Sequence, residues 1–259
     1  MSSTYRDLYD ASARAAIKHT LFKPYTPDEA DILIPGEIFV DDNGKFFPRL
    51  HGEHLGCFAG GMFALGGMLT DNERHVEIGR KLTWGCIWAY KNSPLGIMPE
   101  TFSMAPCPKS SRCRWNEQKY RDAVRLENDM WLDDEQLNAE IKNLRLRPGF
   151  TSVPDRRYML RPEAIESVFV LWRISGDPKL VDVAWEMFTA IEKHTKTAKG
   201  NAALADVLVA RDPPKEDRME SFWMAETLKY FYLMFSEPGL ISLDEYVFNT
   251  EGHPFRRPV

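Results

Sequence analysis

The sequence lacks any apolar run near the length of about 20 residues that a membrane-spanning helix requires. It also has no excess of positive charge, since 33 Lys and Arg stand against 38 Asp and Glu, and the net charge of −5 does not favour binding to nucleic acid. The first twenty residues hold Arg6, Asp7, Asp10, Arg14 and Lys18 instead of an apolar core, so a signal peptide is not predicted there. We therefore expect neither a membrane segment nor a nucleic-acid partner in this chain.

Cysteine is scarce, with four residues in 259. These residues, Cys57, Cys86, Cys107 and Cys113, do not have the spacing of a zinc knuckle or of a CxxC redox motif. Two interpretations remain open: four buried thiols in a cytosolic protein, or two disulfides formed in an oxidising compartment. Composition alone slightly favours the thiols.

Apolar residues recur at helical spacing along most of the chain, which predicts an all-α protein. A first helix is expected over residues 5–21, before Pro24 and Pro27. Two further helices, joined by a short turn at residues 70–72, form a predicted αα-hairpin. Their apolar stripes, both expected to be buried, are Leu55, Phe58, Met62, Leu65 and Leu69 on the first helix and Ile78, Leu82, Gly85, Cys86 and Ala89 on the second.

Strand and loop signals are weaker. Residues 38–40 and 46–47 flank Asp42-Asn43-Gly44, a pattern typical of a short β-hairpin. Residues 103–158 are polar and marked by prolines, so we expect loops around one or two short helices there.

Helices resume in the last hundred residues. One begins near Leu160, a second covers about residues 179–195, and a third covers residues 217–235, where Asp217 and Glu220 resemble a capping box. Helices in pairs favour a helical repeat or an α/α toroid. With 44% hydrophobic and 27% charged residues, the chain has the composition of a soluble domain with a sizeable core.

Glu163 is the first candidate for chemistry. It follows Pro162, which suits the first position of a helix, so its carboxylate is expected in the first turn. Free backbone N–H groups and the positive end of the helix dipole both favour the ionised form there. Glu163 is therefore a better candidate for a general base than for an acid. The alternative is an acidic helix start on a solvated face, which is common.

Phe222 and Glu226 are four residues apart and are predicted to share one helix face. A ring beside a carboxylate suits a sugar, because the ring covers the C–H face and the acid accepts hydroxyl hydrogen bonds. Plain core packing explains the same pattern and is favoured by the pattern alone. Residues 249–254 predict a turn after a strand, in which Thr250 offers a hydroxyl and a carbonyl oxygen to a hard cation such as Ca²⁺.

Taken in order, five segments resemble glycoside hydrolase family 47, the class I α-1,2-mannosidases. The segments are HLGCFAGGMFALGG from His54, GIMPETF from Gly96, YMLRPEAIESVFVLWRISGDP from Tyr158, DRMESFWMAETLKYFYLMFS from Asp217 and LDEYVFNTEGHP from Leu243. The resemblance implies an (α/α)7 barrel, a helical toroid with short β-hairpins, whose site lies in the barrel core above a calcium ion. It also implies that residues 1–259 are the C-terminal portion of one such catalytic domain.

Carried over by position, the resemblance implies a set of site residues. Glu163 matches the catalytic base, Phe222 matches the ring that stacks on mannose, and Thr250 matches the direct calcium ligand. The positions that match sugar or water contacts are His54, Arg161, Glu166, Glu226 and Glu251. For the cysteines, the resemblance implies a family disulfide between Cys57 and Cys86, and a second pair, Cys107 and Cys113, closing a small loop.

The implied function is calcium-dependent hydrolysis of terminal α-1,2-linked mannose from high-mannose N-glycans, with inversion. The implied location is the lumen of the endoplasmic reticulum or Golgi, or the cell exterior. The family's general acid and two further acidic residues lie in an N-terminal half that has no counterpart here, so this chain alone is expected to be inactive and that half is an expected partner. The alternative is a catalytically inactive, lectin-like relative that binds mannose or a glycoprotein. A helical interaction scaffold would explain the helices but not the motifs.

Overall fold

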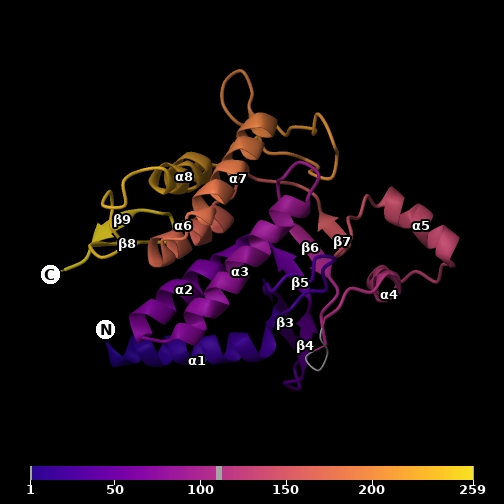
Figure 1. Cartoon of the computed structure of the whole chain (residues 1–259), viewed down its shortest axis with the longest axis horizontal. Coiled ribbons are helices and arrows are strands. Elements are labelled where there is room, and N and C mark those ends of the chain that lie inside the picture. The colour runs from indigo at the N-terminus through magenta and orange to yellow at the C-terminus, as the bar shows by residue number, and fades with distance from the viewer. Residues whose placement is uncertain (1, 109–112, 259) are drawn as a thin grey trace. The chain divides into compact units, whose positions relative to one another are not determined.

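The computed structural model describes residues 2–108 and 113–258. Helices predominate among them, and the strands form short antiparallel groups (Figure 1), so the predicted helical class with short β-hairpins is confirmed. Within these residues, no helix has the length and apolar character needed to cross a bilayer. The chain divides into a first unit, Met1–Gly56 with Pro99–Arg156, and a second unit, Cys57–Met98 with Arg157–Val259.

The first unit begins with helix α1 (Ser3–His19), as predicted, and continues with short strands. The paired strands are β1 (Leu21–Phe22) with β2 (Ile34–Pro35), β3 (Glu37–Val40) with β4 (Phe46–Arg49), and β5 (His51–Glu53), β6 (Thr101–Met104) and β7 (Phe150–Asp155) in one sheet. The β3–β4 hairpin is the predicted one. Its turn forms because the Asp41 carboxylate accepts hydrogen bonds from the N–H groups of Asn43 and Lys45, at 3.0 and 2.8 Å.

Two short helices, α4 (Glu117–Glu127) and α5 (Asp134–Asn143), occupy the region predicted as loops around one or two helices. Asp133 and Gln136 form a capping box at the start of α5, in which each side chain accepts a hydrogen bond from the other residue's backbone N–H. The helices of this region are therefore specified by local chemistry as well as by their apolar faces.

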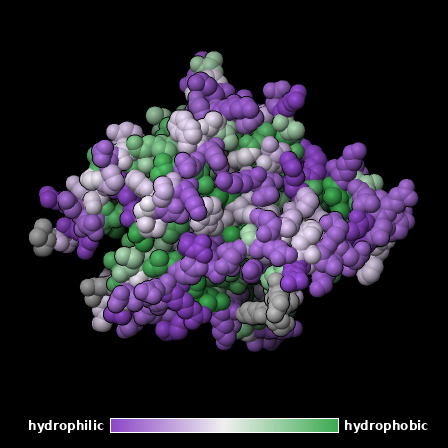
Figure 2. Space-filling view, viewed as in Figure 1, coloured by the Kyte–Doolittle hydropathy of each residue, from purple (hydrophilic) through white to green (hydrophobic). Residues whose placement is uncertain are grey.

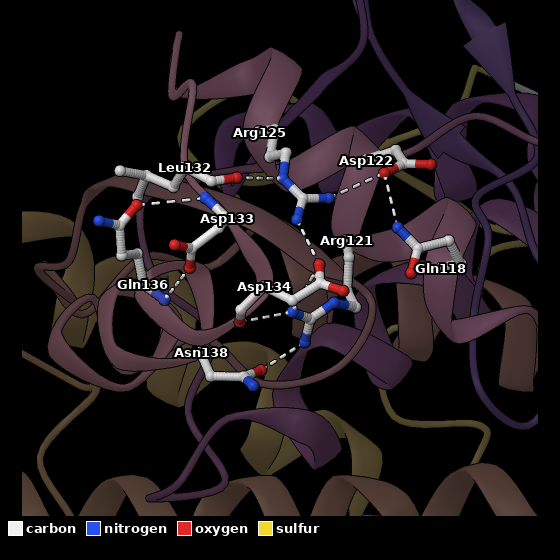
Figure 3. Close-up of polar contacts among 9 residues, drawn as sticks. All are labelled: Gln118, Arg121, Asp122, Arg125, Leu132, Asp133, Asp134, Gln136 and Asn138. Carbon is white, nitrogen blue, oxygen red and sulfur yellow. Dashed lines mark hydrogen bonds and ion pairs between the residues drawn. The ribbon is translucent and has the colours of Figure 1, made fainter.

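Two arginines of α4 hold α5 in place (Figure 3). Arg125 donates to the Leu132 carbonyl oxygen at 3.0 Å and pairs with the Asp134 carboxylate. Arg121 donates to the Asp134 carbonyl oxygen at 2.8 Å and also to the Asn138 side chain. Asp122, Asp133 and Asp134 each have a carboxylate oxygen that faces an arginine or an N–H group, and we call this network the α4–α5 clamp.

The second unit is built from helices and one hairpin. Its elements are α2 (Phe58–Thr70), α3 (Glu73–Asn92), α6 (Glu163–Ser175), α7 (Lys179–Thr195), the π-helical turn η2 (Trp223–Thr227), α8 (Leu228–Met234), and strands β8 (Tyr246–Phe248) and β9 (Pro254–Arg256). Helix α2 packs on α3 and on α6, and α6 also packs on α7 and α8. Helix α6 is therefore the central element of this unit.

Helix α2 buries its small residues, contrary to the prediction for its apolar stripe. The residues that it buries are Gly60, Gly61, Phe63, Ala64, Gly67 and Thr70. A Cβ atom on Gly60 would lie 2.5 Å from the Thr83 hydroxyl of α3, so the two helices approach more closely than a larger residue permits. Leu55, Phe58, Met62 and Leu69 are exposed instead, and hydrophobic residues accordingly reach the molecular surface among hydrophilic ones (Figure 2). The stripe predicted for α3 is buried, as expected.

The helix expected over residues 217–235 begins later than predicted. The Glu216 N–H group donates to the Ala203 carbonyl oxygen at 2.9 Å, and the Ala203 N–H group donates to the Arg218 carbonyl oxygen at 2.8 Å. This long-range pairing keeps residues 216–218 out of a helix, with a bend at Asp217, and helical structure starts at Ser221. The predicted capping box was therefore wrong, since the backbone that it would have organised is already paired elsewhere.

All four cysteines lie in disulfides. Cys57 and Cys86 are bonded with their Cα atoms 6.0 Å apart, which joins the N-terminal end of α2 to α3. Cys107 and Cys113 form the second bond, with a Cα separation of 5.6 Å. Both pairings are those implied by the family resemblance, and the alternative of four thiols is wrong.

Candidate active site

Helix α6 begins with an acidic residue at its N-terminal end. Pro162 occupies the N-cap position, Glu163 is the first helical residue, and Glu166 lies one turn further on. Proline suits this place because its fixed φ fits the entry to a helix and it has no N–H group to leave unpaired. Glu163 is only 9% exposed. The alternative prediction, that Glu163 lies on a solvated acidic face, is therefore wrong.

The entry to α6 is strained and fixed. Leu160 is fully buried and has a positive φ of 64°, a left-handed conformation that costs a non-glycine residue about 1–3 kcal/mol. Its carbonyl oxygen accepts a hydrogen bond of 2.7 Å from the buried Thr227 hydroxyl, at the end of the π-helical turn. This bond fixes the start of α6 to the turn that precedes α8.

Arg161 links an acid to an aromatic ring. Its guanidinium nitrogen lies 3.7 Å from a Glu163 carboxylate oxygen, and its Cζ lies 5.8 Å from the centre of the Phe222 ring. Phe222 directly precedes the π-helical turn and is half-buried. The base candidate and the predicted sugar-stacking ring therefore contact one and the same cation.

Glu226 projects from the π-helical turn, and Tyr230 follows it one turn later on α8. Such turns are rare and occur frequently at functional sites. The Tyr230 hydroxyl donates a 2.7 Å hydrogen bond to the Glu166 carboxylate, which connects α8 to α6. Tyr230 is itself fully buried and Glu166 is half-buried, so this contact is partly buried.

Burial and neighbouring acids raise the pKa values of two glutamates in this region. Burial raises the pKa of Glu166 to about 7; the Tyr230 hydrogen bond lowers it, and the charges of Glu163 and Glu226 add to the rise. Burial also raises the pKa of Glu226, with further contributions from Glu163 and Glu251, while Lys229 opposes the rise. Two carboxyl groups of the five motifs, Glu166 and Glu226, therefore have raised pKa values.

The β8–β9 turn is organised by Asn249. Its side-chain oxygen accepts hydrogen bonds from the N–H groups of Glu251 and His253, at 3.1 and 2.8 Å. Gly252 has a φ of 67° and places its carbonyl oxygen 2.6 Å from the Lys229 ammonium nitrogen of α8. Thr250 lies at the exposed part of this turn.

An aromatic cluster holds the acid-bearing elements together. The Phe248 ring of β8 lies 6.0 Å from the Phe169 ring of α6 and 5.7 Å from the Tyr230 ring of α8, measured between ring centres. Phe169 and Tyr230 also contact each other, at 5.6 Å. These contacts bring the first turn of α6, the π-helical turn and the β8–β9 turn into one region of the second unit.

Of the predicted site residues, all but His54 and the second disulfide belong to the second unit. His54 lies in the first unit, where it is fully buried and its backbone N–H group donates to the Glu100 carbonyl oxygen at 2.9 Å. Sequence reasoning missed Thr227, Tyr230 and Asn249, which position the acids. Only Asn249 has a local signal, an asparagine near a glycine in a turn.

The comparisons with known proteins agree with this arrangement. The family model described as glycosyl hydrolase family 47 matches residues 1–257. The chain belongs to glycosyl hydrolase family 47. It is 36% identical over 224 residues to mannosyl-oligosaccharide alpha-1,2-mannosidase IA of Drosophila melanogaster, covering 85% of this chain and 28% of that protein. It is 34% identical over 257 residues to mannosyl-oligosaccharide alpha-1,2-mannosidase 1B of Emericella nidulans, covering 97% and 44%.

The structure of this family-47 chain is similar to that of an alpha-1,2-mannosidase from Trichoderma reesei. The TM-score is 0.77 at 29% sequence identity, over 97% of this chain and 47% of the other. That neighbour is an (α/α)7 barrel, the fold type that the sequence resemblance implied. The chain spans less than half the length of each of these three proteins.

Family 47 is generally metal-dependent. The charge of Glu163 raises the pKa of both Glu166 and Glu226, and Glu226 adds to the rise at Glu166, so a cation near these carboxylates would relieve their repulsion. The exposed Thr250 turn, beside Glu251, supplies the hydroxyl and carbonyl oxygens that Ca²⁺ prefers.

Proposed function

We propose that this chain forms the base side of a calcium-dependent site that hydrolyses terminal α-1,2-linked mannose from high-mannose N-glycans with inversion. One observation supports it most: acids from three separate elements gather in one region, beside a half-buried aromatic ring and an arginine. Inverting glycosidases need a base that activates water on the face of the sugar opposite the acid.

In this proposal Glu163 is the general base. The neighbouring Arg161 cation, 3.7 Å away, favours the carboxylate form that accepts a proton from water. Phe222 covers the apolar face of the mannose ring, in reach of the same arginine. Arg161, Glu166, Glu226 and Glu251 bind sugar hydroxyls or ordered water.

Calcium bound at Thr250 would supply positive charge that holds sugar hydroxyls and water. Thr250 would hold the ion directly, and the surrounding glutamates would hold its water ligands. The general acid is supplied from outside these 259 residues. The raised pKa of Glu166 does not make it the acid, because its carboxylate is turned toward the buried Tyr230 hydroxyl. An oxidising lumen of the secretory pathway, or the cell exterior, is the location that two disulfides favour.

Calorimetric titration of the purified chain with α-1,2-mannobiose tests the site. We expect calcium-dependent binding that weakens in Phe222→Ala, because the variant removes the ring that would cover the apolar face of the sugar. Trp185→Ala is the matched control: this aromatic residue of α7 is 57% exposed in the same unit and lies outside the proposed site. Binding that is absent, or equal in both variants, would contradict the proposal.

The same preparations, with calcium, are assayed for mannose release. We expect none from the chain alone, because an inverting hydrolase without its acid loses about 10²–10⁴-fold in rate. Release that disappears in Glu163→Gln would place the acid within this chain. Binding without hydrolysis that persists when the rest of a family-47 domain is supplied would favour the lectin-like alternative.

A further inference from the structure

Three potential metal ligands meet at the base of the β3–β4 hairpin in the first unit. Glu37 is the first residue of β3, and His51 and Glu53 belong to β5. A ring nitrogen of His51 and one carboxylate oxygen from each glutamate all lie within 4.8 Å of one another. The closest pair is His51 Nε2 and Glu53 Oε1, at 3.0 Å.

The strand geometry directs two of these side chains to the same side. His51 and Glu53 are two residues apart, so they share one face of β5. Gly52, between them, faces the opposite side, where a Cβ atom would lie 2.5 Å from the Phe102 ring. Strand β6 holds β5 in register, with His51 opposite Ser103. The pair is thus presented on the outer face, with side-chain exposures of 24% and 34%.

The donor set suits a borderline divalent ion. Imidazole nitrogen and carboxylate oxygen are ligands that Zn²⁺ accepts at about 2.0–2.2 Å, which places tetrahedral ligand atoms about 3.3 Å apart. His51 and Glu53 already have nearly that spacing. Glu37 is exposed, and one of its carboxylate oxygens lies within 4.8 Å of both other ligand atoms, so it completes the set, with water as the fourth ligand. Thiolates do not compete, because all four cysteines are in disulfides.

We propose that Glu37, His51 and Glu53 form a binding site for Zn²⁺, separate from the proposed calcium site in the second unit. The ion closes the base of the β3–β4 hairpin, because it joins the residue that begins the hairpin to the strand that follows it. The hairpin presents Phe39, Phe46 and Phe47 to solvent, and the ion fixes this aromatic surface on the sheet. The proposed mannosidase function does not depend on it.

Calorimetric titration with zinc chloride, in buffer that contains saturating calcium, tests the proposal. We expect one zinc ion per chain and a rise in melting temperature, since a ligand that binds only the folded state stabilises it. His51→Ala should weaken binding about 100-fold, and Glu37→Gln and Glu53→Gln about tenfold each. His194→Ala is the matched control, because this histidine lies on α7 in the second unit.

Three results would overturn the site. They are the absence of zinc binding, binding that His51→Ala leaves unchanged, and binding that Glu37→Gln leaves unchanged, which would reduce the cluster to a surface ion pair of His51 and Glu53. If circular dichroism shows that His51→Ala does not fold, the conservative Glu37→Gln variant decides. Since the calcium and sugar residues belong to the second unit, either proposal can fail without the other.

Discussion

Acidic side chains occupy opposite settings in the two units. At the α4–α5 junction, hydrogen bonds from Arg125 and then Arg121 lower the pKa of Asp134 (Figure 3). In the second unit, burial raises the pKa of Glu166 to about 7, and neighbouring glutamates add to it. The same functional group is thus stabilised as a carboxylate in one unit and destabilised in the other.

The difference separates structural acids from functional ones. An acid that accepts hydrogen bonds from two arginines, as Asp134 does, is already balanced by positive charge, and this pairing indicates a structural role. Where several acids lie close together with too few cations, their carboxylates repel one another, and a metal ion or a proton can relieve this repulsion. On this criterion the second unit, and not the α4–α5 clamp, has the character of an active site.

The largest expected effect is on the pH dependence of stability. In calcium-free buffer, Glu166 retains a proton in the folded state up to about pH 7, whereas in the unfolded state it loses that proton near 4.5. The folded state therefore binds more protons between these values, and stability falls as the pH rises through this window. A shift of this size corresponds to about 3 kcal/mol. Urea unfolding at pH 4.5 and 7.5 measures it.

Glu166→Gln is the matched variant for this experiment, because it keeps the size of the side chain and removes the titration. We expect its unfolding free energy to fall less between the two pH values than that of the wild type. An equal fall in both proteins would show that Glu166 titrates normally and that the comparison between the units is mistaken.

We expect calcium to increase the unfolding free energy of the second unit by an amount similar to the effect of Glu166. At a concentration one hundred times its dissociation constant, a ligand that binds only the folded state adds about 2.7 kcal/mol to stability. We expect calcium to raise the melting temperature at pH 7.5, and Thr250→Ala to reduce this rise because it removes the proposed hydroxyl ligand. Ser242→Ala, in the loop before β8, serves as control. A calcium effect of equal size in Thr250→Ala would exclude that ligand.

Tyr230→Phe should have an intermediate effect. The variant removes the 2.7 Å hydrogen bond to Glu166 and keeps the ring contacts with Phe169 and Phe248. Loss of a hydrogen bond to a charged group costs about 1.5–3 kcal/mol, and part of it is recovered when Glu166 is protonated. The pKa of Glu166 should therefore rise further, and the destabilisation should be larger at pH 8 than at pH 5. A pH-independent loss would indicate packing alone.

Asp134→Asn should have the smallest effect. The acid is exposed, so its ion pairs with Arg121 and Arg125 are screened by water and salt. We expect a melting temperature within error of the wild type at high salt and a small decrease at low salt. A large decrease that persists in high salt would mean that the α4–α5 clamp is more than a surface network.

The sequence predicted the helical class, the hairpin at Asp42–Gly44 and the position of Glu163, because these depend on local chemistry. The predictions from the sequence failed where contacts between distant residues determine the structure. The apolar stripe of α2 was assigned to the core, but glycines on the other face bring α2 close to α3. The raised pKa of Glu166 was missed because it arises from burial and from residues far away in sequence, such as Tyr230.

We propose that the glutamates of the second unit form a site that lacks a cation when calcium is withheld. A ¹³C NMR titration of the Glu166 carboxyl carbon, with and without calcium, measures the effect of the ion on these glutamates. We expect a pKa of about 7 without calcium and a decrease of at least about one unit with it, because a nearby cation favours the carboxylate. A pKa near 4.5 in both conditions, or a raised pKa that calcium leaves unchanged, would contradict it.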